Sequence, residues 1–261
     1  MKGLHILTLV LFTSFFAQVY AQEITGIATY KSFLKFDLKL DSTQVPKAMH
    51  ADLEHIIKQQ TQKEYELQFT NNEAVYKEKE KLEAPGKGIG GAMVSSTGGV
   101  GIWYKNLKDN RLIIQRDLYG KLFLIKDTME ELDWKLEKET KYIGEYVCFK
   151  ATRTRIFNSE TGEKKETHIV AWYTPEIPVA FGPQGHYGLP GLILEVNDGD
   201  NTLLCNRIIL NPKNGVEISE PRMGKKVSKT EYEEIYRKKT EEMKERNGFP
   251  GSKTIEIRVG G

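Results

Sequence analysis

Short segments in which apolar and polar residues alternate, separated by turn residues, make up most of the chain. Residues 65–69 alternate in this way, Asn71 and Asn72 form a turn, and residues 74–81 are expected to return as a second strand. Similar segments predict strands over residues 24–40, 102–106, 111–118, 121–126, 132–136, 146–157, 168–174, 192–196, 203–210 and 253–259. Because turn residues recur between short strands, the pattern favours an antiparallel sheet over alternating strand and helix units.

Two segments instead carry the spacing of amphipathic helices. Pro46 opens the first, whose expected apolar face is formed by Val45, Met49, Leu53, Ile56 and Ile57. Ser228 opens the second, with Glu231 completing a capping box and an apolar face of Tyr232, Ile235, Tyr236 and Met243. We therefore predict a mainly β protein with two helices (α+β), built as a large curved antiparallel sheet or half-barrel with helices on one face.

The first 21 residues have the composition of a secretory signal peptide. Lys2 supplies a positive start, residues 6–16 are largely apolar, and Val19 and Ala21 suit the −3 and −1 positions of a cleavage site. The alternative is an uncleaved anchor helix, but the apolar run is short for a membrane span. We expect cleavage before Gln22, an exported protein of the periplasm or the extracellular space, and no membrane-spanning segment after cleavage.

The mature chain, residues 22–261, is expected to form one domain. It includes a Gly-rich segment at residues 84–101 and a final helix and strand over residues 228–259. The whole chain has 38 Lys and Arg against 36 Asp and Glu, so its net charge is close to zero. This balance gives no electrostatic reason to expect nucleic acid as a partner.

Cys148 and Cys205 are the two cysteines, and both lie in predicted strands. An even number of cysteines in an oxidising exported compartment is typical of a disulfide. Such a bridge would stabilise the fold by about 4 kcal/mol. The alternative is two free thiols packed as small apolar side chains, and the sequence alone does not show that the two residues approach each other.

Few residues have the types and spacing that catalysis or metal binding requires. Gly86, Gly88 and Gly91 match a dinucleotide fingerprint by letter, but no strand precedes them and no helix follows. His168, His186 and Glu195 could converge if the loop containing His186 folds back over the strand containing His168. This trio is a weak candidate for metal or acid–base chemistry, and a single histidine in a strand more often has a structural role. We expect no cofactor and assign no catalytic residue.

The segment IVAWYTPEIPVAFGPQGHYGLPGLILEV, residues 169–196, is the most distinctive part of the chain. Leu189 precedes Pro190 and is expected to be extended, and Pro190 and Gly191 suit the centre of a type II turn. The structural motif comprises Trp172, Tyr173, Gly188, Leu189, Pro190, Gly191, Leu192 and Ile193. One interpretation is a rigid connection that closes the core, with Trp172 as packing. The other is a binding site whose rim is formed by Phe181, Tyr187 and Pro190.

Several segments agree in order with one known family. These are Trp134-Lys-Leu, residues 140–148, Lys150-Ala-Thr, residues 171–178, and the closing Tyr187-Gly-Leu-Pro-Gly-Leu-Ile-Leu-Glu195. Together they resemble the GLPGLI family of exported Bacteroidetes-type proteins, a resemblance that implies export but supplies no catalytic residues. The order of strands and helices is also similar, more weakly, to the lipoprotein-carrier (LolA-like) half-barrels.

The leading hypothesis is a non-enzymatic binding or carrier protein of the cell envelope, with an apolar or peptide-like ligand. One alternative is a metal-assisted envelope hydrolase that uses His168, His186 and Glu195. Another alternative is a structural partner of an outer-membrane complex, which would dock through exposed edges of the sheet.

Overall fold

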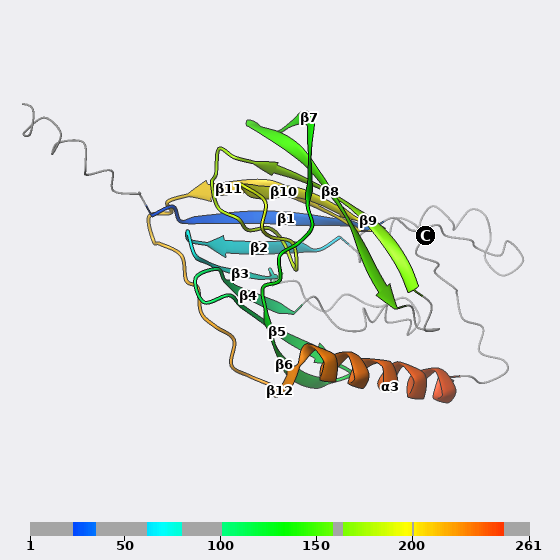
Figure 1. Cartoon of the computed structure of the whole chain (residues 1–261). Helices are drawn as coiled ribbons and strands as arrows, with labels where there is room; N and C mark the ends of the chain where they lie inside the picture. The colour runs from blue at the N-terminus through cyan, green and yellow to red at the C-terminus, as the bar shows by residue number, and fades with distance from the viewer. Residues whose placement is uncertain (1–22, 35–61, 80–100, 159–163, 200, 248–261) are drawn as a thin grey trace, which may run out of the picture.

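The computed structural model of the chain describes residues 23–34, 62–79, 101–158, 164–199 and 201–247. In these residues twelve strands form one sheet, in the order β12-β6-β5-β4-β3-β2-β1-β11-β10-β9-β8-β7 (Figure 1). The strands are β1 Gly26–Leu34, β2 Glu64–Phe69, β3 Glu73–Glu78, β4 Ile102–Asn106, β5 Arg111–Leu118, β6 Lys121–Thr128, β7 Lys135–Ile143, β8 Tyr146–Asn158, β9 Lys164–Thr174, β10 Leu192–Asp198, β11 Asn201–Leu210 and β12 Lys225–Ser228.

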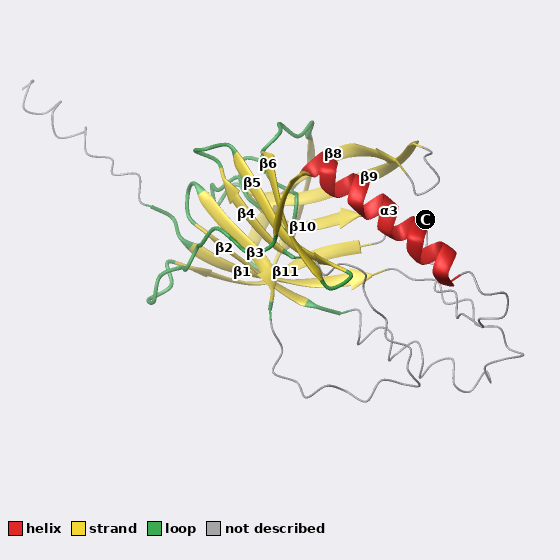
Figure 2. Ribbon diagram, turned by 90° about the horizontal axis from the view of Figure 1, so that it is seen from below, coloured by secondary structure: helices red, strands yellow, loops and turns green. Residues whose placement is uncertain are grey.

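Most strands pair with their neighbours in the sequence, and these pairs are antiparallel. Two pairs depart from this meander. β1 lies beside β11 at the centre of the sheet, and β12 pairs in parallel with β6 at one end. The sheet curves strongly when it is viewed from below (Figure 2). The prediction of a mainly β protein with a large antiparallel sheet is therefore confirmed.

One helix, α3 (Lys229–Asn247), is present in the described part of the chain. Its start is the predicted capping box, because Glu231 N–H donates to Ser228 Oγ at 3.2 Å and Ser228 N–H donates to a Glu231 carboxylate oxygen at 2.7 Å. Tyr232 and Ile235 pack against β5, β6 and β12. The prediction of two helices is thus only partly met, since the helix expected from Pro46 lies outside the described residues. The same holds for the strand expected at 253–259 and for nearly all of the Gly-rich segment.

The connection between β6 and β7 differs from the sequence prediction. A strand was expected over residues 132–136, but residues 129–134 are irregular and β7 begins at Lys135. We call residues 129–134 the strap. In Figure 1 it runs from β6 to β7 across the front of the sheet. β7 is an edge strand, and its run of exposed charged residues lacks the alternation by which the other strands are recognised.

The main apolar cluster joins the central strands to the loop that follows β9. Tyr30, Leu67 and Tyr76 from β1 to β3 pack with Ile177 and Phe181 of that loop. A second cluster comprises Ala151, Ile169, Ala171, Tyr173, Leu189, Ile193 and Val196, with Trp134 and Phe149 at its edge. The loop after β9 is therefore part of the hydrophobic core rather than a surface excursion.

The two cysteines do not form the predicted bridge. Cys148 on β8 and Cys205 on β11 are both free and buried, and β9 and β10 separate their strands in the sheet. Each thiol lies against a backbone carbonyl, that of Tyr146 at 3.7 Å and that of Arg207 at 3.5 Å. Burial raises the pKa of Cys148 to about 11 and that of Cys205 to about 12. The prediction of a disulfide is wrong, and the alternative of packed thiols describes the structure.

The two thiols should therefore react with a labelling reagent only after unfolding. At pH 8 we expect no label on the native protein, because both groups are buried and the pKa values hold them as thiols. After unfolding without reductant, mass spectrometry should find one label on each cysteine. If the unfolded protein took up no label, the two cysteines would be joined in a disulfide after all.

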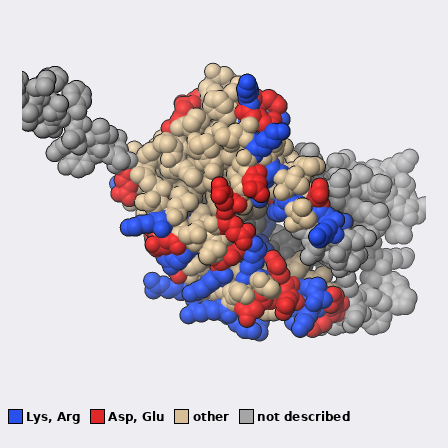
Figure 3. All heavy atoms as spheres, in the orientation of Figure 1, with Lys and Arg blue, Asp and Glu red and all other residues tan. Residues whose placement is uncertain are grey.

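Basic and acidic side chains are intermixed on the face shown in Figure 3, and neither sign covers it alone. This arrangement agrees with the near-zero net charge of the chain. Among the described residues, no helix has the length and apolar composition needed to cross a membrane.

Candidate functional site

Residues 175–191, which we call the motif loop, return from β9 to β10 and are tied to β10 by backbone hydrogen bonds. Leu192 N–H donates to Ile177 C=O at 2.9 Å, and Ile193 N–H donates to Phe181 C=O at 3.0 Å. Phe181 and Tyr187 form an isolated β-bridge across the loop. These bonds satisfy backbone groups that would otherwise be buried without partners, and they tie the loop to the sheet.

The turn at Pro190 is tighter than the predicted type II turn. Gly191 N–H donates to Leu189 C=O at 2.8 Å, which closes a three-residue turn around Pro190. Gly191, for which a positive φ suits the predicted turn, has a φ of +155°, and the φ of Gly188 is also positive, at +87°. At Gly191 a Cβ atom would lie 2.1 Å from Thr174 C=O oxygen, so this position admits only glycine.

A lysine is buried beneath the motif loop. Lys105 on β4 has no exposed surface, and its Nζ donates to Gly182 C=O at 2.6 Å and to His186 C=O at 3.4 Å. No carboxylate in the described residues pairs with it. Burial lowers the pKa of Lys105 to about 7. The lysine thus anchors the loop by hydrogen bonds to its backbone.

His186 forms a second buried polar contact of the loop. Its Nε2 lies 3.7 Å from a carboxylate oxygen of Asp198, whose other carboxylate oxygen accepts a 2.9 Å hydrogen bond from Arg155. Burial lowers the pKa of His186 and outweighs the effect of Asp198, so the ring is neutral at pH 7. Its Nδ1 is buried and has no hydrogen-bond partner among the described residues. The ring is only 2% exposed.

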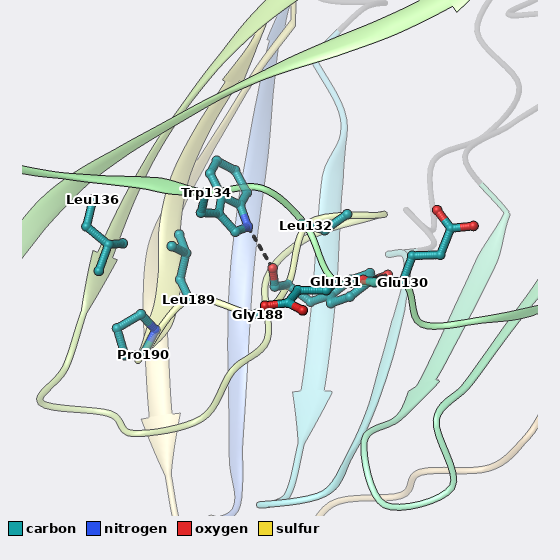
Figure 4. Close-up of a pocket in the computed structure, with 9 residues that line it drawn as sticks. Glu130, Glu131, Leu132, Trp134, Leu136, Gly188, Leu189 and Pro190 are labelled. Atoms are coloured by element: carbon teal, nitrogen blue, oxygen red, sulfur yellow. Dashed lines mark hydrogen bonds between the residues drawn. The ribbon is translucent and has the colours of Figure 1, made fainter.

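The strap is fastened to the motif loop by two hydrogen bonds that use aromatic side chains. Trp134 Nε1–H donates to Tyr187 C=O at 2.8 Å, the bond drawn in Figure 4, and the Tyr187 hydroxyl donates to Glu130 C=O at 2.9 Å. Segments more than fifty residues apart in the sequence are thereby held side by side. These two hydrogen bonds position the strap against the motif loop.

A cavity of about 230 Å³, which we call the first cavity, lies between the strap and the motif loop (Figure 4). Its lining residues are Glu130, Glu131, Leu132, Trp134, Leu136, Tyr187, Gly188, Leu189 and Pro190. Leu136 is 55% exposed and Pro190 is also exposed, so apolar surface is open to the solvent here. Glu130 and Glu131 are the acidic residues of the strap side.

A second cavity, of about 420 Å³, lies at the end of the strap beside β8 and β9. Its lining residues are Asp133, Lys135, Thr152, Arg153, Thr154, His168, Ile169 and Val170. The guanidinium of Arg153 lies 5.1 Å from the centre of the Trp134 ring, in a cation–π arrangement. Trp134 therefore lines the first cavity and contacts Arg153, a lining residue of the second.

The residues expected to form a binding rim divide into two groups. Tyr187 and Pro190 line the first cavity, whereas Phe181 is fully buried in the main cluster and lines neither described cavity. Trp172 is half-buried, with Lys141 Nζ 4.4 Å from its ring centre. Tyr173, Leu189, Leu192 and Ile193 are buried.

The histidines and the glutamate of the candidate metal site have separate partners. His168 is exposed and lies 3.2 Å from the Thr154 hydroxyl, and Glu195 pairs with Lys141 at 2.6 Å. His186 faces Asp198 instead. The described residues contain no group of three side chains placed to hold a metal ion.

Lys105 and Arg153 were not recognised from the sequence. The alternation of β4 places Lys105 on the same side as Trp103, so a charged residue at an inward position was a usable signal. Arg153 had no comparable signal, because its neighbours in the sequence are threonines and arginine and its environment comes from Trp134.

Tyr187→Phe should test the bond between the motif loop and the strap. Loss of the hydroxyl removes its hydrogen bond to Glu130 C=O, and we expect a decrease of about 1 kcal/mol in the free energy of unfolding. Urea denaturation measures this decrease. Tyr142→Phe is the control, because Tyr142 is 74% exposed. Equal stability of the Tyr187→Phe variant and the wild type would contradict the structural role of this bond.

Comparison with curated proteins gives no match. Among solved structures, two crystal forms of PNGF-II are similar, with a TM-score of 0.47 in each case and sequence identities of 14% and 13%. They cover 81% and 82% of this chain, and the chain spans only 33% and 32% of theirs.

A family model also matches the centre of the chain. The match covers residues 134–195, from the end of the strap through β7, β8, β9 and the motif loop into β10. It therefore includes most of the residues that line both cavities. The GLPGLI name is not confirmed by this match, which is to the family described as "Protein of unknown function (Porph_ging)".

Proposed function

We propose that the protein is exported and acts as a non-enzymatic binding protein of the cell envelope, with a peptide-like ligand. The observation that carries this proposal is the first cavity, in which open apolar surface is held between two fixed segments of the chain. A ligand would place one apolar side chain between Leu132, Leu136 and Pro190.

The walls of the first cavity are formed before any ligand arrives. The two hydrogen bonds of Trp134 and Tyr187 fix the strap, and the buried Lys105 fixes the motif loop. A preformed site loses less conformational entropy when a ligand binds. This arrangement supports binding rather than a purely structural role for the motif.

The size of the cavity favours a peptide over a lipid. Sites for whole small molecules usually measure about 300–1,000 Å³. The first cavity, at about 230 Å³, is smaller and suits a single side chain with the rest of the ligand outside. Of the apolar and peptide-like ligands considered from the sequence, the peptide-like class fits better.

Occlusion of the first cavity tests the proposal. Gly188 has a φ of +87° and open space where a Cβ would lie, so Gly188→Asn adds a side chain at the cavity with little strain, since asparagine tolerates positive φ. Gly120→Asn is the matched control, because Gly120 also has positive φ and open space but lies in the β5–β6 turn.

The two variants are compared in binding to an array of synthetic hexapeptides. We expect the wild type and Gly120→Asn to bind the same subset of peptides, enriched in Leu or Ile at one position. Gly188→Asn should bind this subset about tenfold more weakly. Peptides bound equally well by all three proteins would show that the first cavity is not the site.

Docking to a partner protein through the sheet edge is a second candidate. β7 is an edge strand, and Leu136 and Tyr142 on it are 55% and 74% exposed, with Ile156 on β8 at 60%. An unpaired edge can accept a strand from another chain. Tyr142→Lys, which leaves both cavities intact, should weaken such a complex without affecting binding of short peptides.

Export has its own test. The protein secreted by its native host should have a mass that corresponds to a chain starting at Gln22, because Val19 and Ala21 fit a signal peptidase site. Intact-mass measurement of the exported protein decides this. A chain that retains residues 1–21 would contradict the proposal of a cleaved signal peptide.

A further inference from the structure

We propose that the second cavity binds a carboxylate through Arg153, and that this carboxylate is the C-terminus of the peptide whose last side chain occupies the first cavity. The assignment of the peptide rests on the proposed function. The assignment of a carboxylate site rests on Arg153 and its surroundings alone.

Arg153 lacks an ion-pair partner among the described residues. Its Nε is buried and makes no hydrogen bond there, and its guanidinium has no carboxylate of the described chain within 4 Å. Its contact is with the face of the Trp134 ring. A partly buried guanidinium whose donors lose water without gaining an acceptor is unfavourable. An arriving anion would satisfy these donors.

The charged groups around the second cavity favour an anion of single charge. Arg153 and Lys135 are positive, Asp133 is negative, and His168 is exposed at the margin. The nearby Asp198 is engaged by Arg155 and faces His186. The cavity therefore has an excess of one positive charge when His168 is neutral, which matches one carboxylate better than a doubly charged phosphate.

The chemistry of arginine also favours a carboxylate. A planar guanidinium presents parallel N–H groups that can bind both oxygens of a carboxylate at once. The hydroxyls of Thr152 and Thr154 already contact Glu137 and His168, at 2.8 Å and 3.2 Å, so Arg153 is the principal donor for a ligand. The Trp134 ring lies beside this guanidinium, with Arg153 Cζ 5.1 Å from the ring centre, and the cation–π contact favours this placement.

The position of Trp134 joins the two cavities. Its ring lines the first cavity and also lies against Arg153, and its sequence neighbours Asp133 and Lys135 line the second cavity. A ligand that fills both cavities must carry an apolar group and a carboxylate on opposite sides of one of its own residues. The last residue of a peptide, with a Leu or Ile side chain, has this arrangement.

N-acetyl-leucine and N-acetyl-leucinamide are the probes, because they differ only in the terminal carboxylate. Binding is followed by the NMR signal of the Trp134 indole N–H, assigned by Trp134→Phe. We expect the acid to bind the wild type about tenfold more tightly than the amide. Arg153→Gln should reduce binding of the acid to the level of the amide, whereas Arg237→Gln on α3 should leave both unchanged.

A third probe separates this inference from the proposed function. Sodium acetate carries the carboxylate without the apolar side chain, so it should shift the Arg153 Nε–H signal of the wild type and of Gly188→Asn alike. Acetate binding without any binding of the leucine derivatives would support the carboxylate site and contradict the peptide ligand. Equal binding of acid and amide to the wild type, which requires no variant to fold, would overturn the inference.

Discussion

Gly191→Ala is expected to lower the free energy of unfolding by about 3–5 kcal/mol. The new Cβ would lie 2.1 Å from the carbonyl oxygen and 2.5 Å from the carbonyl carbon of Thr174, and 2.9 Å from Cα of Pro175. These are backbone atoms, so no side-chain rotation can relieve the contacts. The start of β10 would have to move away from the end of β9, which lies within the second apolar cluster.

Gly188→Ala is the matched control for this prediction. Gly188 has a φ of +87°, but nothing lies within 4 Å of the place that a Cβ would take. Its substitution should cost only about 1 kcal/mol of backbone strain. Chemical denaturation of both variants gives the comparison. Equal losses at the two positions would show that positive φ, and not the close approach to Thr174, makes Gly191 necessary.

Lys105→Met is expected to change how stability depends on pH. In the wild type the pKa of Lys105 is about 7 in the folded state, against 10.5 for an ordinary lysine. Between these values the unfolded state binds more protons, so the stability of the wild type rises with pH. Relative to Lys105→Met, the wild type should gain about 2 kcal/mol between pH 7 and pH 9. The methionine side chain does not titrate, so it adds no such dependence of stability on pH.

Urea denaturation of the two proteins at several pH values measures this difference. Because the raised pKa values of the buried tyrosines and cysteines are common to both proteins, their effects cancel in the comparison. The control is Lys126→Met, which removes an exposed lysine from β6. The free energies of unfolding of the wild type and Lys105→Met should not differ by the same amount at pH 7 and pH 9. A constant difference would contradict a buried lysine at this position.

The strands with clear alternation were the predictable part of the fold. β2 and β3 follow the expected segments closely, because one face of each strand is buried and the other is not. β7 and β12 were not predicted as strands of this extent. β7 is a charged edge strand, and the four residues of β12 depend on parallel pairing with β6, a contact between distant segments.

The candidate site was predictable only in part. The density of glycine and proline in residues 182–191 marked a special loop, and Tyr187 and Pro190 do line a cavity. Phe181 was misplaced because an aromatic residue in a loop can point inward as well as outward. The role of Trp134 arises from its contact with Tyr187, which no local pattern encodes.

The state of the two cysteines was likewise not predictable from the sequence. Two cysteines in strands of an exported protein favour a bridge by composition. In the structure both thiols are free, although Cys148 and Cys205 lie in the same apolar cluster. Residue types at two positions therefore do not determine whether the thiols pair.

Photo-crosslinking tests the central claim, that the strap and the motif loop together form the binding site. The probe is a hexapeptide from the bound subset with photo-leucine as its last residue, and mass spectrometry maps the crosslinked residues. We expect crosslinks in residues 130–136 and 187–190, the two segments that contain the lining residues of the first cavity. They should be lost in Gly188→Asn and kept in Gly120→Asn. Crosslinks confined to α3, or to the part of β7 around Tyr142, would contradict a binding site between the strap and the motif loop.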